Sequence, residues 1–366
     1  MGLSTERKIV ITLLILSASS LFFTPPLVIR LIFGFLQAYY LPGLVFLLFL
    51  GDRRRPRFDN LYLPILISPI IISLLVLAVY RFTGSFNTSI KISLSVLYIL
   101  LVTALFTGKF RHTERDSTVP GSILLLSFLF CGVVTITYLV NRYILVYTDA
   151  WYHVSVVYEI LDRGIPPMDP RLPDIPIRYM WFYHLFQAIW KELSGLSITH
   201  VLGFFNIINA FAFPYLIARL TSIFTKDRLY ILSAPVFAFV GLESAGWVLW
   251  PLSVVRAFFG DVGGTAELAR IISGIELNGV KVIYFLKAPW TWLMSLPDKF
   301  LTITAFSYTL NLFLLCFILV LAGGFHKRSS FKAAASIFLT MIGALLFHVV
   351  TGLGLILTAI GAGMLL

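Results

Sequence analysis

The chain of 366 residues is too apolar for an ordinary soluble protein: 59% of it is hydrophobic and 12% is charged, against roughly half and about a quarter in soluble domains. The net charge of +11 does not indicate a nucleic-acid partner, because the basic residues form short clusters between apolar segments and no stripe on a soluble domain. Cys131 and Cys316 lie inside apolar runs, so a disulfide framework and a cysteine-rich metal site are both excluded. The composition predicts a polytopic membrane protein.

Apolar segments of membrane-spanning length recur along the whole chain. A bilayer requires about 20 apolar residues per helix. By this measure we expect an all-α fold with about ten transmembrane helices, at 9–23, 31–50, 61–80, 92–107, 123–140, 199–220, 229–250, 300–321, 333–349 and from 353 onward.

The charged loops predict the orientation of these helices. The segment Tyr179–Leu193 is too short and too polar to span, so we expect an amphipathic helix on the membrane surface. The short basic loops near 53–57, 109–115, 226–228 and 327–332 then share one side, which the positive-inside rule makes the cytoplasm. All seven tryptophans fall on the opposite side, as expected of interfacial residues. We therefore expect a multi-pass protein of the cell membrane with a cytoplasmic N-terminus.

Three regions follow from this threading. Residues 1–140 form the N-terminal transmembrane helices, and residues 141–198 form an external loop with interfacial helices and the candidate active site. Residues 199–366 form the C-terminal transmembrane helices and contain a second external loop at 251–299.

The first external loop concentrates the residues suited to acid/base chemistry. Asp149 precedes a predicted helix, Ala150–Arg163, which ends at Gly164. One interpretation is structural, because Asp is a favoured N-cap and Gly a favoured C-terminal cap. The other is functional: Asp149 and His153, four residues apart, share one helix face. There they would deprotonate an acceptor hydroxyl or help to hold a divalent metal ion.

A longer pattern follows the same helix. It comprises EILDRGIP, then DP, a Tyr-rich stretch with His184, a helix ending ELSGLS, and a span containing NIINAFAFPYLIARL. Over Tyr147–Leu220, and more loosely through His348, the chain resembles the GT-C superfamily of integral-membrane glycosyltransferases. The resemblance implies a polyprenyl-phosphate-linked sugar donor and a catalytic acidic residue in the first large external loop.

The resemblance also assigns roles to individual residues. Asp149 maps onto the family's catalytic carboxylate, Asp169 is the expected second acidic residue, and His153 would support them. We expect the donor phosphate to lie near Arg178 or Lys299. The substrate-binding set is completed by His184, Asp298 and His348. Each has a plainer interpretation: Lys299 next to Asp298 would be an interfacial lysine at a helix end, and His348 a helix–helix hydrogen-bonding residue.

The predicted reaction is transfer of a sugar from the lipid-linked donor to a glycan, lipid or protein acceptor on the external face. Its need for a divalent metal cofactor is left open. A first rival is a noncatalytic membrane subunit that keeps the fold and binds a membrane protein partner. A second is a transporter, which the sequence favours less because the polar residues concentrate outside the spans, whereas transport sites lie near the bilayer midplane.

Overall fold

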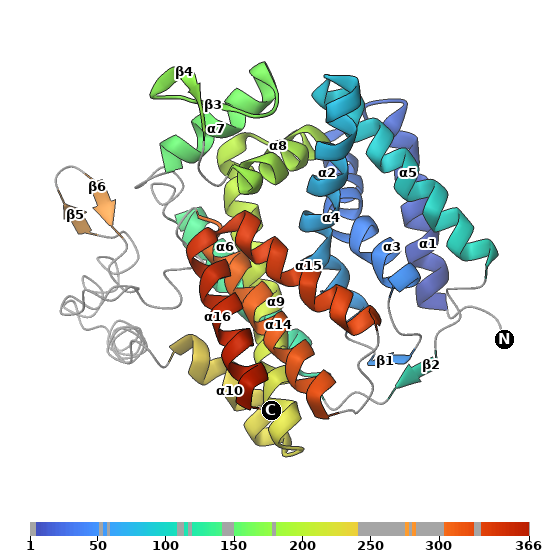
Figure 1. Ribbon diagram of the computed structural model, residues 1–366, viewed down its shortest axis with the longest axis vertical. Coiled ribbons are helices and arrows are strands. Elements are labelled where there is room, and N and C mark those ends of the chain that lie inside the picture. The colour runs from blue at the N-terminus through green and yellow to red at the C-terminus, as the bar shows by residue number, and fades with distance from the viewer. Residues whose placement is uncertain are drawn as a thin grey trace, which may run out of the picture. The chain divides into compact units, whose positions relative to one another are not determined.

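The computed structural model describes residues 5–50, 54–56, 59–107, 113–115, 119–140, 150–177, 181–240, 275–277, 280–282, 304–325 and 331–365 (Figure 1). The chain divides into two compact units, assembled from segments far apart in sequence. The first comprises Met1–Thr118, Val154–Val201 and Leu312–Leu366, and the second Val119–His153 and Leu202–Asn311. The three regions predicted from the sequence (1–140, 141–198 and 199–366) are defined by their positions relative to the membrane, so they stay a prediction.

Helices dominate the N-terminal part of the first unit. They are α1 (Thr5–Ser17), the 3₁₀ turn η1 (Ala18–Leu21), α2 (Leu27–Phe35), the π-helical turn η2 (Leu36–Tyr40), α3 (Leu41–Leu50), α4 (Asp59–Thr83) and α5 (Phe86–Phe106). The π turn lies directly before Pro42, which has no N–H to donate to a preceding carbonyl. Pro and single-turn π bulges are both recognised causes of irregularity in a long helix.

Two polar contacts tie these helices together. Gln37 is buried in η2, and the two hydrogens of its Nε2 are within donating distance of three acceptors: the Ser17 carbonyl at 2.8 Å, the Ser20 hydroxyl at 3.0 Å and the Tyr98 hydroxyl at 3.1 Å. The Gly43 N–H donates to the hydroxyl of Ser68 on α4 at 2.8 Å. In an apolar surrounding such bonds hold helices together, since each polar group needs a protein partner.

A short parallel sheet joins two of the basic loops. Strand β1 (Arg54–Pro56) pairs with β2 (Thr113–Arg115), with Arg54 opposite Thr113 and Pro56 opposite Arg115. The two loops therefore lie at the same end of the α4–α5 pair, as the charge distribution predicts. This sheet was not predicted from the sequence.

The segment between α6 (Ile123–Val140) and α9 (Ile198–Phe224) contains helix α7 (Ala150–Arg163), the antiparallel hairpin β3 (Met168–Asp169) and β4 (Leu172–Pro176), and helix α8 (Phe182–Ser194). The chain continues with α10 (Arg228–Val240), the hairpin β5 (Ile275–Leu277) and β6 (Val280–Val282), α14 (Phe306–Phe325), α15 (Phe331–Phe347) and α16 (Val349–Leu365). Within the first unit, α8 contacts α2, α4 and α15, and α15 contacts α16.

Four of the described helices are long and apolar enough to cross a membrane: Leu27–Phe49, Leu61–Thr83, Phe86–Phe106 and Ile198–Phe224. Shorter apolar helices occupy Ile11–Leu21, Ile123–Leu139, Arg228–Ala238, Phe306–Leu321, Ala334–Phe347 and Val349–Thr358. Each predicted span thus overlaps an apolar helix. The helical membrane character is confirmed, and the number of about ten crossings stays a prediction.

Candidate functional site

Helix α7 has the boundaries that the sequence predicts. It begins at Ala150 and ends at Arg163, and Gly164 follows with a left-handed φ of +93°, which a glycine adopts without strain. The Gly164 N–H closes the helix by donating to the Ile160 carbonyl at 3.1 Å. A Cβ at Gly164 would overlap the hydroxyl of Tyr80 on α4. The positive φ favours glycine here, and a larger residue would also displace the Tyr80 side chain.

Of the two residues predicted to act at the start of α7, one lies within the described residues and the other does not. His153 lies on the first turn, half-buried, with its ring against the edge of Tyr152 at a centroid distance of 6.0 Å. Asp149 lies outside the described residues, directly before the first residue of the helix. Its pairing with His153 stays a prediction.

Asp169 closes the turn of the β3–β4 hairpin. Its carboxylate accepts hydrogen bonds from the Arg171 backbone N–H at 2.9 Å, Nε at 3.0 Å and Nη2 at 2.9 Å. These bonds and the charge of Arg171 lower the pKa of the Asp169 carboxyl below its ordinary value. A carboxylate engaged in this way is a weak base, so the observed geometry favours a structural role for Asp169 in the turn.

Helix α8 differs from the expected surface helix. Its 13 residues extend roughly 20 Å, too short for a hydrocarbon core of about 30 Å, which agrees with the prediction that it does not span. The expectation of an exposed polar face is wrong, however: every residue from Phe182 to Trp190 is buried. Helices α2, α4 and α15 pack around it, so α8 is an internal helix of the first unit.

Two polar side chains of α8 lie in the protein interior. His184 is 2% exposed and its ring packs against the edge of Tyr183 at 5.2 Å. One turn further on, Gln187 is fully buried, and neither its Nε2 nor its Oε1 has a hydrogen-bond partner in the part of the chain that the structure describes. Buried polar atoms are normally satisfied, and the sequence analysis did not single out Gln187.

His348 occupies the sharp break between α15 and α16. Its Nδ1 accepts a hydrogen bond from the Thr351 N–H at 3.3 Å and shares a hydrogen bond with the Thr351 hydroxyl at 2.8 Å, so the imidazole caps the start of α16 as an N-cap side chain does. Phe347 beside it contacts Phe182 of α8 at 5.3 Å. The residue before His348 therefore packs against the first turn of α8, and the substrate-binding role of His348 and His184 stays a prediction.

The remaining predicted residues, Arg178, Asp298 and Lys299, lie outside the described residues. Within the described ranges, no three His, Cys, Asp or Glu side chains gather where they could hold a metal ion. Asp169, the described acidic candidate, is already engaged by Arg171. The described residues therefore do not form a metal site.

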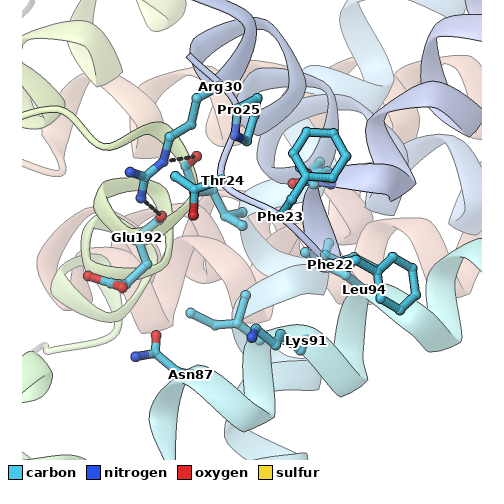
Figure 2. A pocket seen from close by; sticks show the side chains of 14 residues that line it. Phe22, Phe23, Thr24, Pro25, Arg30, Asn87, Lys91, Leu94 and Glu192 are labelled. Atoms are coloured by element: carbon cyan, nitrogen blue, oxygen red, sulfur yellow. Dashed lines mark hydrogen bonds between the residues drawn. The ribbon is translucent and has the colours of Figure 1, made fainter. Parts of the chain in front are cut away.

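A polar cavity of about 310 Å³ lies in the first unit at the C-terminal end of α8 (Figure 2). Its walls are the α1–α2 connection, the first two turns of α5, and Glu192 and Leu193 of α8. The threading predicted from the sequence places all three segments on the external side. Their meeting around one cavity confirms that they share one end of the helices.

Arg30 forms one wall of this cavity. Its Nη2 donates to the Glu192 carbonyl at 2.6 Å and its Nε to the Leu193 carbonyl at 3.3 Å, which satisfies carbonyls left over at the end of α8. Asn87 and Lys91 of α5 lie on the opposite wall (Figure 2). The sequence analysis missed this site because Arg30 and Leu193 are 163 positions apart.

The second unit contains a buried polar cluster that the sequence analysis also missed. Asn206 of α9 donates to the Tyr138 hydroxyl of α6 at 3.0 Å and accepts from the Ser307 hydroxyl of α14 at 2.8 Å. Asn311 donates to the carbonyl and the side-chain oxygen of Asn209. These contacts join α6, α9 and α14 through interhelical hydrogen bonds, as polar residues do in membrane bundles.

The long apolar helices and their buried polar links make the chain a helical membrane protein. Comparison with family models, with curated proteins and with solved structures gives no match.

Proposed function

We propose that this protein is a membrane glycosyltransferase of the GT-C type, which transfers a sugar from a polyprenyl-phosphate donor to a glycan, lipid or protein acceptor. The observation that carries the proposal is the polar segment α7–hairpin–α8, which interrupts the apolar helices between α6 and α9. It is the segment that resembles the catalytic external loop of these enzymes.

The proposed chemistry requires few groups. Asp149 accepts the proton of the acceptor hydroxyl as this oxygen attacks the anomeric carbon, and the sugar–phosphate bond breaks with its electrons on the phosphate. Cationic groups stabilise the leaving phosphate, a role proposed for Arg178 or Lys299. His153 follows Asp149 by four positions in the sequence; if the helical spacing extends to Asp149, the two would share one face, and His153 would orient the carboxylate or the acceptor.

The structure suggests positioning roles for three of the supporting residues. Because Asp169 is bound by Arg171, its proposed contribution is to shape the hairpin, and Asp149 stays the proposed base. Because His348 caps α16 through Thr351, its proposed contribution is to position the end of α15 near α8. His184 is held inside the protein and would act through this same packing.

The test is sugar transfer by the purified protein in proteoliposomes. Labelled monosaccharides on polyprenyl phosphate are supplied one at a time, and release of polyprenyl phosphate is measured together with transfer of the label. Turnover with one donor supports the proposal. Absence of turnover with every donor, together with a membrane protein that copurifies in fixed stoichiometry, would favour the noncatalytic subunit.

A further inference from the structure

The cavity beside the end of α8 has two cationic groups with free hydrogen-bonding capacity. Arg30 is held in place through Nε and Nη2, which leaves its Nη1 without a protein hydrogen bond among the described residues. The Lys91 ammonium across the cavity likewise has no ion pair or hydrogen bond within the described ranges. The one carboxylate in the wall, Glu192, is bound to the Lys191 ammonium at 2.8 Å. The cavity thus favours an anion.

The arrangement of these groups suits a phosphate. A guanidinium whose position is fixed by two carbonyls is preorganised, and a lysine supplies a point charge from another direction. Asn87, one helical turn before Lys91 on α5, adds an amide donor on the same wall (Figure 2). Positions 87 and 91 lie near the N-terminus of α5, where the helix dipole also favours negative charge.

Apolar side chains around the cavity indicate that this anion belongs to a lipid. Phe22 and Phe23, which both line the cavity, are 90% and 56% exposed. Exposed phenylalanine side chains beside polar groups suit a membrane surface, where interfacial segments bury Trp, Phe and Leu at the boundary between headgroups and acyl chains. Beyond Lys91, α5 exposes Ile92, Val96 and Ile99, which offer an apolar path for an acyl chain directly beside the charged group.

We propose that this cavity binds the phosphate headgroup of an anionic membrane phospholipid, with the phosphate between Arg30 and Lys91 and an acyl chain along the exposed side of α5. Because the end of α8 forms part of the wall, a bound lipid would hold α8 against α2 and α5. This proposal does not depend on glycosyl transfer.

The test counts lipids bound to the full-length protein by native mass spectrometry. Detergent-solubilised protein is titrated with phosphatidylglycerol, with phosphatidylcholine, and with glycerol phosphate, which lacks acyl chains. We expect saturable binding of phosphatidylglycerol. Lys91→Gln should weaken it about 10-fold or more, the scale of one lost charged hydrogen bond, and Lys91→Arg should retain it.

Lys8→Gln is the matched control. It removes the same charge at the N-terminal end of α1, whereas the cavity lies beyond the C-terminal end of that helix, so the binding should be unchanged. Equal binding by wild type and Lys91→Gln would overturn the proposal. So would equal affinity for phosphatidylcholine, or binding of glycerol phosphate as tight as that of the lipid, which would assign the cavity to a soluble phosphate.

Discussion

At Gly43 the backbones of α3 and α4 lie close together, and an added methyl group there should destabilise the first unit. A Cβ would lie 2.7 Å from the Cα of Pro64 and 2.8 Å from its carbonyl carbon, whereas carbon atoms in contact are about 3.5–4.0 Å apart. The obstacle is backbone, which has no rotamer to change. The two helices would therefore have to separate by roughly 1 Å.

The cost can be worked from this geometry. Overpacking costs about 1–3 kcal/mol, and the fixed backbone places Gly43→Ala near the upper end. The separation also stretches the 2.8 Å hydrogen bond to Ser68, a loss of about 1 kcal/mol, while alanine's better helix propensity returns about 1 kcal/mol. We expect a net loss of about 2–3 kcal/mol in the free energy of unfolding.

The assay is reversible unfolding in mixed micelles, followed by tryptophan fluorescence. Gly354→Ala is the control, because a Cβ at Gly354 in α16 meets nothing within 4 Å, so this variant should be neutral or more stable by up to about 1 kcal/mol. If Gly43→Ala unfolds at the same midpoint as Gly354→Ala, the inferred α3–α4 contact is refuted.

Three further predictions follow from single contacts. In a ¹³C carboxyl titration, the pKa of Asp169 should lie below the ordinary value of about 3.9, and Arg171→Ala should raise it. The charged pair stabilises the hairpin at a pH above the ordinary pKa, and this contribution is lost as the pH falls through the lowered pKa. Replacing Gln37 by Leu removes the hydrogen bonds that its Nε2 donates to Ser17, Ser20 and Tyr98 and should cost about 1–3 kcal/mol in the free energy of unfolding. The same unfolding assay measures it, and unchanged stability would contradict the network. When single cysteines replace Arg55 and Asp174 in turn, an impermeant thiol reagent should label intact cells at position 174 and not at position 55. Labelling at position 55 would overturn the threading.

Local signals predicted local structure well. The limits of α7 follow from residues within the segment itself, since Gly164 can adopt the left-handed conformation that ends the helix. The shared side of two basic loops followed from charge, and the pairing of Arg54 with Thr113 agrees with it.

Contacts between distant segments were beyond such signals. The polar residues of α8 predicted a surface helix, but α2, α4 and α15 cover it, and hydrophobic periodicity carries no information about which segments supply that cover. The wall formed by Arg30 and the end of α8 likewise depends on tertiary packing. For the candidate base the sequence remains the source of the assignment, because Asp149 lies outside the described residues.

The most direct test of the proposed function is the turnover of Asp149→Asn. Asparagine caps a helix as well as aspartate does, so folding should be retained, while loss of the general base should lower transfer from the polyprenyl-phosphate donor by about 100-fold or more. Asp162→Asn, at an exposed position near the other end of α7, should leave transfer nearly unchanged. Wild-type turnover in Asp149→Asn would contradict the assignment of Asp149 as the catalytic base.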